Sequence, residues 1–104
     1  ELGTTALSES DISQDYNEEI KKSLRKLIST GNCKKCPLMQ VYLTRVDLTG
    51  AYLKNADLNE ADLSGAYLNR ANLTEANMKN IRNLDSAIKC KTIFSWGEDN
   101  SGCE

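Results

Sequence analysis

Residues 41–80 decide the fold, because they read VYLTR VDLTG AYLKN ADLNE ADLSG AYLNR ANLTE ANMKN, eight five-residue units without an insertion. A large apolar residue stands at the centre of each unit: Leu43, Leu48, Leu53, Leu58, Leu63, Leu68, Leu73 and Met78. Two residues before each centre stands a smaller one: Val41, Val46, Ala51, Ala56, Ala61, Ala66, Ala71 and Ala76. A period of five fits neither the 3.6 of an α-helix nor the 2 of a strand. We therefore expect a coil that turns the same two positions of every unit inward.

Tandem A-[DN]-L-x-x units are the signature of the pentapeptide-repeat family, which residues 41–80 closely resemble. The resemblance implies an all-β solenoid, a right-handed quadrilateral parallel β-helix with four units, and hence 20 residues, in each coil. The segment 36–40, CPLMQ, keeps Leu38 in phase and extends the pattern by one unit. We therefore place about two to three coils at residues 36–80.

A 20-residue coil predicts that residue n lies above residue n+20 at strand spacing, about 4.8 Å. At the outward position between the two inward residues, the predicted stacks are Tyr42 over Asp62, Asp47 over Tyr67, Tyr52 over Asn72, and Asp57 over Asn77. None of the predicted stacks brings like charges together, which supports the 20-residue frame.

An amphipathic helix is predicted at about residues 13–30, just before the coils. Its apolar stripe consists of Tyr16, Ile20, Leu24, Leu27 and Ile28. Because an uncapped β-helix end exposes its core and unpaired backbone groups, we interpret this helix as a cap. The alternative is a basic helix that binds a membrane or a partner. Residues 1–10 have no periodicity and are expected to form a flexible leader, and the start at Glu1 indicates a processed chain.

Residues 81–104 are expected to cap the other end, and with the helix and coils they complete one domain over residues 11–104. Continuing the repeat would place Asn83 at a buried centre, so the regular coil should end near Asn80. Helical spacing of apolar residues favours a short helix over 81–89, although Ile88 and Ile93 return to the five-residue phase and leave a distorted last coil open. We expect Ile93, Phe94 and Trp96 to form a lid, with a Trp96-centred ligand site as the alternative.

Four cysteines in a chain of 104 residues favour an oxidising compartment and a disulfide framework. Three pairings are possible. Because two to three coils separate the chain ends by about 10 to 15 Å, local pairing of Cys33 with Cys36 and of Cys90 with Cys103 is favoured. A four-cysteine zinc site and a redox role for Cys33 and Cys36 are the alternatives. The segments flanking the repeats, LISTGNCKKC at 27–36 and CKT…G…NSGC at 90–103, also resemble a secreted cyanobacterial subgroup of the family.

The composition excludes several kinds of chemistry. Without histidine the chain has no imidazole base and no Ser-His or Cys-His pair. The 13 basic and 15 acidic residues give no electrostatic case for binding nucleic acid or an anionic membrane. The resemblance implies that some family members imitate DNA in shape and charge. This block has only about two coils, and its charged residues nearly balance, so it is too short and too neutral to do so. We therefore expect no enzyme, no cofactor, no metal and no membrane insertion.

The leading functional hypothesis is a non-catalytic, extracytoplasmic structural or interaction module, in a periplasm or a thylakoid lumen. A thiol-redox protein using Cys33 and Cys36 is the alternative. We expect a monomer with an unknown protein partner. Tyrosine and arginine are favoured at binding hot spots. The predicted partner face therefore consists of Tyr42, Tyr52, Tyr67, Arg45 and Arg70.

Overall fold

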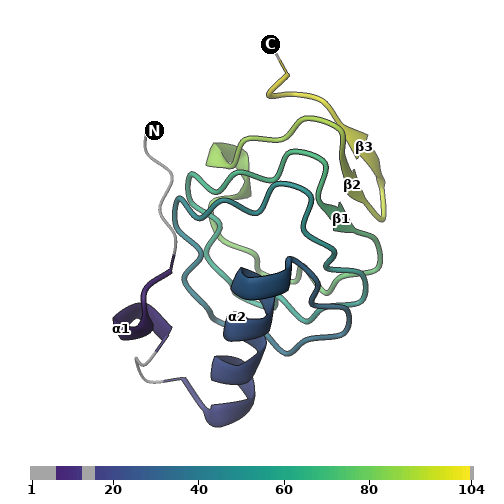
Figure 1. The fold of residues 1–104 in the computed structure, drawn as a ribbon. Coiled ribbons are helices and arrows are strands. Elements are labelled where there is room, and N and C mark those ends of the chain that lie inside the picture. The colour runs from purple at the N-terminus through teal and green to yellow at the C-terminus, as the bar shows by residue number, and fades with distance from the viewer. Residues whose placement is uncertain (1–6, 13–15, 104) are drawn as a thin grey trace.

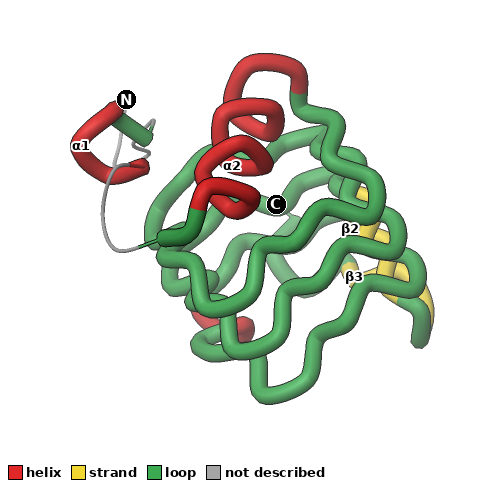
Figure 2. Tube along the Cα trace, turned by 90° about the horizontal axis from the view of Figure 1, so that it is seen from below, coloured by secondary structure: helices red, strands yellow, loops and turns green. Residues whose placement is uncertain are grey.

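The computed structural model describes residues 7–12 and 16–103. Two helices come first, α1 (Glu9–Ile12) and α2 (Glu18–Thr30), and the chain then winds into a stack of loops. In Figure 1 the loops are stacked between α2 at one end and strands β2 and β3 toward the other. Figure 2 shows the same loops as parallel turns that make almost no regular strand. The irregular appearance is expected, because each side of the coil is only a few residues long before it turns.

Parallel bridges show that the loops form a β-helix-type coil with the predicted 20-residue register. Four ladders run along the stack, and we number them as sides. Side 1 is Asn32–Tyr52–Asn72, side 2 is Pro37–Asp57–Asn77, side 3 is Tyr42–Asp62–Arg82, and side 4 is Asp47–Tyr67–Ile88. All four stacks predicted from the outward positions are among these bridges. The first coil therefore spans about 31–50, the second 51–70 and the third 71–91.

The core is the predicted double column of centres and small residues. Every centre from Leu38 to Leu73 is at most 3% exposed. Two cysteines extend these columns into the first coil: Cys33 stands five residues before Leu38 and is fully buried, and Cys36 stands five residues before Val41 and is 7% exposed. The coil therefore begins near residue 31, one unit earlier than the sequence predicted, because cysteine fills an inward position as a small apolar side chain.

The helix α2 caps the first coil. Asn17 is its N-cap and accepts a hydrogen bond from the N–H of Ile20, and Gly31 ends it in the left-handed conformation at φ 72°. Leu24 and Leu27 are buried in the same core as the coil, whereas Ile28, predicted on the buried stripe, is 36% exposed.

The expected leader falls mostly on residues 1–6, which lie outside the described residues. Residues 7–10 of the expected leader are described, and they differ from the expectation because α1 begins at Glu9. Ile12, which follows the leader, is 4% exposed and belongs to the core. Among the described residues, no helix combines the length and apolar character that a membrane span needs.

The predicted helix over 81–89 is wrong, because the chain continues as an irregular third coil that contains only a 3-10 turn, η1 (Leu84–Ser86). Arg82 still bridges Asp62, but Ile88 bridges Tyr67, a separation of 21 residues. One extra residue has therefore been inserted. It turns Asn83 outward at φ 62° and lets the half-buried Leu84 take the inward position.

Three short strands close side 1. The strand β1 (Asn72–Leu73) pairs in parallel with β2 (Thr92–Phe94), which pairs antiparallel with β3 (Gly97–Asp99). Phe94 is 3% exposed and ends the core column, as a lid should. Trp96 stacks on Phe94 with 4.6 Å between ring centroids, so one face of its ring covers the lid residue, although Trp96 itself is 64% exposed.

Candidate functional site

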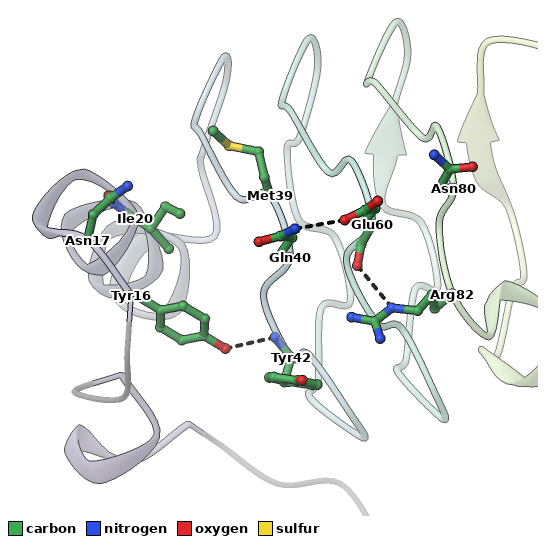
Figure 3. A pocket seen from close by; sticks show the side chains of 9 residues that line it. All are labelled: Tyr16, Asn17, Ile20, Met39, Gln40, Tyr42, Glu60, Asn80 and Arg82. Atoms are coloured by element: carbon green, nitrogen blue, oxygen red, sulfur yellow. Dashed lines mark hydrogen bonds between the residues drawn. The ribbon is translucent and has the colours of Figure 1, made fainter.

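An open groove of about 800 Å³ runs along the corner between sides 2 and 3, from the helical cap to the third coil. Its lining residues are Tyr16, Asn17, Ile20, Met39, Gln40, Tyr42, Glu60, Asn80 and Arg82. Figure 3 shows these side chains laid out in succession from α2 across the three coils. The groove therefore depends on the stacking of the coils, because each coil supplies part of its floor.

The corner between the two sides carries three polar residues 20 apart, Gln40, Glu60 and Asn80. All three have positive φ, at 64°, 61° and 55°. Because the left-handed turn points their side chains away from the core, they form a polar row along the groove. The amide of Gln40 donates a hydrogen bond of 2.7 Å to the Glu60 carboxylate. Glu60 is therefore held in place by the coil before it.

Side 3 supplies an aromatic ring and a cation. Tyr42 is 51% exposed, and the guanidinium carbon of Arg82 lies 5.8 Å from the centroid of its ring. This distance lies within the range of cation–π attraction. Arg82 Nε donates a hydrogen bond of 3.2 Å to the backbone oxygen of Glu60, as Figure 3 shows. The arginine is thus oriented along the groove, with donors of its guanidinium facing solvent.

Tyr16 joins the cap to the coil at the end of the groove. Its hydroxyl oxygen accepts a hydrogen bond of 2.9 Å from the backbone N–H of Tyr42. Partial burial raises the pKa of Tyr16 above its ordinary value, and the hydrogen bond from Tyr42 only partly offsets that effect. Tyr16 is therefore a neutral hydroxyl at physiological pH.

The structure does not gather the five predicted partner residues on one face. Tyr42 lies on side 3, Tyr52 on side 1 and Tyr67 on side 4. Of the five, only Tyr42 lines the groove, whereas Tyr67 and Arg70 line a second hollow of about 580 Å³ beside Cys90 and Cys103. The fifth, Arg45, lies next to Gly65 in the neighbouring coil.

The cysteines are paired as the sequence favoured, Cys33 with Cys36 and Cys90 with Cys103. Cys33 is fully buried, and its sulfur lies 3.3 Å from the carbonyl oxygen of Ser23 in α2. A dithiol that exchanges with other proteins needs an accessible sulfur. The burial of this pair beneath the cap therefore speaks for a structural bond and against the redox alternative. The zinc alternative would need four thiolates, and in the described part of the chain all four sulfurs are engaged in disulfides.

Of the nine residues that line the groove, the sequence placed only Tyr42 on a partner face. It missed Arg82 as a member of the site, and it missed the contact that Tyr16 makes. Arg82 stands 40 residues, or two coils, after Tyr42, so the 20-residue frame itself places the two on one side. It was missed because the coil was expected to end at Asn80. No sequence signal indicated that the Tyr16 hydroxyl would reach the backbone of the coil.

Comparison with known protein families agrees with the geometry of the coil. The family model described as pentapeptide repeats matches residues 40–80 in eight copies. No significant match to a curated protein was found. The matched segment includes four of the nine residues that line the groove, Gln40, Tyr42, Glu60 and Asn80.

Proposed function

We propose that the protein is a non-catalytic interaction module, which holds a partner protein in the groove between the helical cap and sides 2 and 3. The observation that carries this proposal is the pair formed by Tyr42, which is 51% exposed, and Arg82, whose guanidinium lies over its ring. An exposed tyrosine ring beside an oriented guanidinium combines two of the side-chain types that are enriched at binding hot spots.

The rest of the groove suits recognition of a polar segment with an apolar anchor. Met39 is half-buried at the corner, and methionine is enriched in interfaces because its flexible thioether adapts to a partner. The row of Gln40, Glu60 and Asn80 offers amide donors and acceptors beside it. The coils that supply most of the lining are joined by backbone hydrogen bonds, so this part of the surface would lose little backbone entropy when a partner binds.

Catalysis is not part of the proposal, and the pentapeptide-repeat match is consistent with a repeat scaffold. The one carboxylate that lines the groove, Glu60, accepts a hydrogen bond from Gln40. No histidine occurs anywhere in the chain to act as its partner in general acid–base chemistry.

The two disulfides indicate an oxidising environment. We propose a periplasm or a thylakoid lumen, on the resemblance of the flanking segments to a secreted subgroup. The right-handed sense of the coil, which the repeats imply, is part of the same proposal.

The test is affinity capture from an extract of the source compartment, followed by calorimetry with the purified captured protein. The double variant Tyr42→Ser, Arg82→Ser is expected to lose the capture. The matched control Tyr52→Ser, Arg70→Ser removes the same two residue types outside the groove and is expected to keep it. Equal capture by both double variants would refute the groove as the contact surface.

A further inference from the structure

Positive charge is concentrated in one stretch of the chain. Residues 20–46 hold seven of the 13 basic residues and none of the 15 acidic residues. This segment therefore carries a charge of +7 and the rest of the chain −9, although together they give a net charge of only −2. In the fold the segment forms most of α2 and of the first coil. The overall balance that argued against an anionic partner therefore conceals a basic region at the capped end of the stack.

The helix α2 has a buried side and a basic side. The buried side consists of Ile20, Ser23, Leu24 and Leu27. With 3.6 residues in each helical turn, Lys22, Arg25 and Lys26 lie on the opposite side, and all three are exposed. Figures 1 and 2 show α2 lying on the outside of the stack of loops. The helix therefore caps the coil with one side and presents cations to the solvent with the other.

The first corner of the coil adds two cations beside the helix. Lys34 and Lys35 directly follow Cys33, whose sulfur lies 3.3 Å from the carbonyl oxygen of Ser23 in α2. Both lysines are exposed. Together the exposed cations of the helix and of the corner form what we call the basic patch: Lys22, Arg25, Lys26, Lys34 and Lys35.

The fold does not neutralise the basic patch. Its four lysines form no ion pair with any described residue. The acidic residues of α2, Glu18 and Glu19, are confined to its first turn. Lys22 stands three and four residues before Arg25 and Lys26, and like charges at this spacing destabilise a helix. The stability of the cap therefore does not explain why these cations are grouped.

The shape of the patch indicates what kind of anion would fit it. Neither of the two hollows described above is lined by a residue of the patch. The cations are instead spread along a helix about 20 Å long and over the neighbouring corner. Such an arrangement suits an extended surface that carries many negative charges better than it suits one small anion.

An apolar side chain at the edge of the patch favours a lipid surface. Ile28 is 36% exposed and stands three residues after Arg25 on the helix. Helices that bind the membrane interface combine cations with apolar side chains that reach the headgroup region. Clusters of about four to eight Lys and Arg residues on an amphipathic helix are typical of binding to anionic lipids. The five cations of the patch fall within that range.

From these observations we infer that the protein binds the surface of an anionic lipid bilayer through the basic patch. The contact is peripheral and electrostatic, because the apolar side of α2 remains buried in the core. The coils then lie on the far side of α2 from the bilayer. The groove stays open to a partner protein, since none of its lining residues belongs to the patch. This inference therefore goes beyond the proposed function and does not depend on it.

Cosedimentation with lipid vesicles at low ionic strength tests this inference. The wild type is expected to bind vesicles that contain phosphatidylglycerol and to leave vesicles of phosphatidylcholine alone unbound. Added NaCl should release the protein, because salt screens the attraction. Each cation near an anionic surface strengthens partitioning about fivefold, so removing two should weaken it about 30-fold.

Two double variants remove the two halves of the patch: Lys22→Gln with Lys26→Gln, and Lys34→Gln with Lys35→Gln. Each pair is expected to show the 30-fold loss. Glutamine suits both places, because it is a good helix former and because Gln40 has φ 64°, close to the 63° of Lys35. Circular dichroism and thermal unfolding establish that every variant is folded.

The matched control is the double variant Lys79→Gln, Lys91→Gln. It removes two exposed lysines from the corresponding positions of the third coil, and Lys91 also has positive φ, at 56°. The control changes the net charge by the same amount and is expected to keep binding close to that of the wild type. A wild type that does not bind phosphatidylglycerol vesicles overturns the inference, as does equal binding to both lipids or an equal loss in the control. Capture of an acidic protein by the patch, without vesicle binding, also overturns it.

Discussion

The guanidinium carbon of Arg82 lies 5.8 Å from the centroid of the Tyr42 ring, although the two residues are separated by two whole coils. Asp62 stands between them on the ladder of side 3. Arg82 belongs to the irregular third coil, so the candidate site depends on a segment that departs from the repeat. The conformation of this segment is therefore open to direct tests.

The outward turn at Asn83 predicts how substitutions there affect stability. Asn83→Ala removes the hydrogen bond of 3.0 Å that the Asn83 amide donates to Asp62. It also places alanine at φ 62°, a left-handed conformation that asparagine tolerates better than alanine does. The substitution should therefore lower the free energy of unfolding by about 1 to 3 kcal/mol. Asn83→Gly loses only the hydrogen bond and should cost less. Urea unfolding measures both. A helix over 81–89 requires the opposite order, because alanine would then stabilise and glycine would destabilise.

Truncation should cost more in the middle of the core column than at its open end. Leu58 is fully buried in the second coil, so Leu58→Ala should lower the free energy of unfolding by about 2 to 5 kcal/mol. Met78→Ala, at the half-buried open end, should cost distinctly less, because its cavity is open to solvent. Chemical denaturation of the two variants at low protein concentration makes the comparison. Equal losses would mean that the third coil is covered as completely as the second.

The disulfides should be reduced in a fixed order. Cys103 is exposed whereas Cys33 is fully buried, so Cys90–Cys103 should open first in graded dithiothreitol under native conditions. Its loss frees a 14-residue loop and should cost about 3 kcal/mol. Alkylation followed by peptide mass mapping gives the order. Reduction of Cys33–Cys36 first, with the fold intact, would revive the redox alternative.

Tyr16 predicts a loss of stability in alkali. Burial raises its folded pKa above the ordinary 10.0, so the folded protein holds the phenol proton more tightly than the unfolded chain does. The resulting stabilisation is complete below pH 10 and disappears as the pH rises through the folded pKa. Thermal unfolding should show a smaller alkaline loss for Tyr16→Phe than for the wild type. Tyr52→Phe is the control, and an equal effect of the two variants would count against this assignment.

Much of the coil could be predicted because one constraint repeats. A five-residue period and four units in a coil were enough to pair Tyr42 with Asp62 and Asp57 with Asn77. The same frame also separates Tyr42 from Tyr52, because ten residues are two sides of the coil. The 20-residue frame therefore already places the three predicted tyrosines on different sides of the coil.

The ends were harder to predict, because there single residues override the period. The extra residue before Ile88 moves Leu84 into the core in place of Asn83, and spacing alone cannot distinguish such an insertion from the start of a helix. Trp96 was predicted in the lid, and its ring does stack on Phe94, but it lies in the turn between β2 and β3 and remains 64% exposed, which its size alone does not indicate. Contacts between the cap and the coil, such as Tyr16 with Tyr42, depend on tertiary geometry that the pattern does not encode.

Site-specific photo-cross-linking tests the central claim most directly. A photoreactive phenylalanine derivative is placed at position 42, in the groove, and in a second protein at position 52, on side 1, and each is irradiated in an extract of the source compartment. The account predicts one cross-linked partner at position 42, lost when Arg82→Ser is added, and none at position 52. Cross-linking of the same partner at position 52 but not at 42 would contradict it.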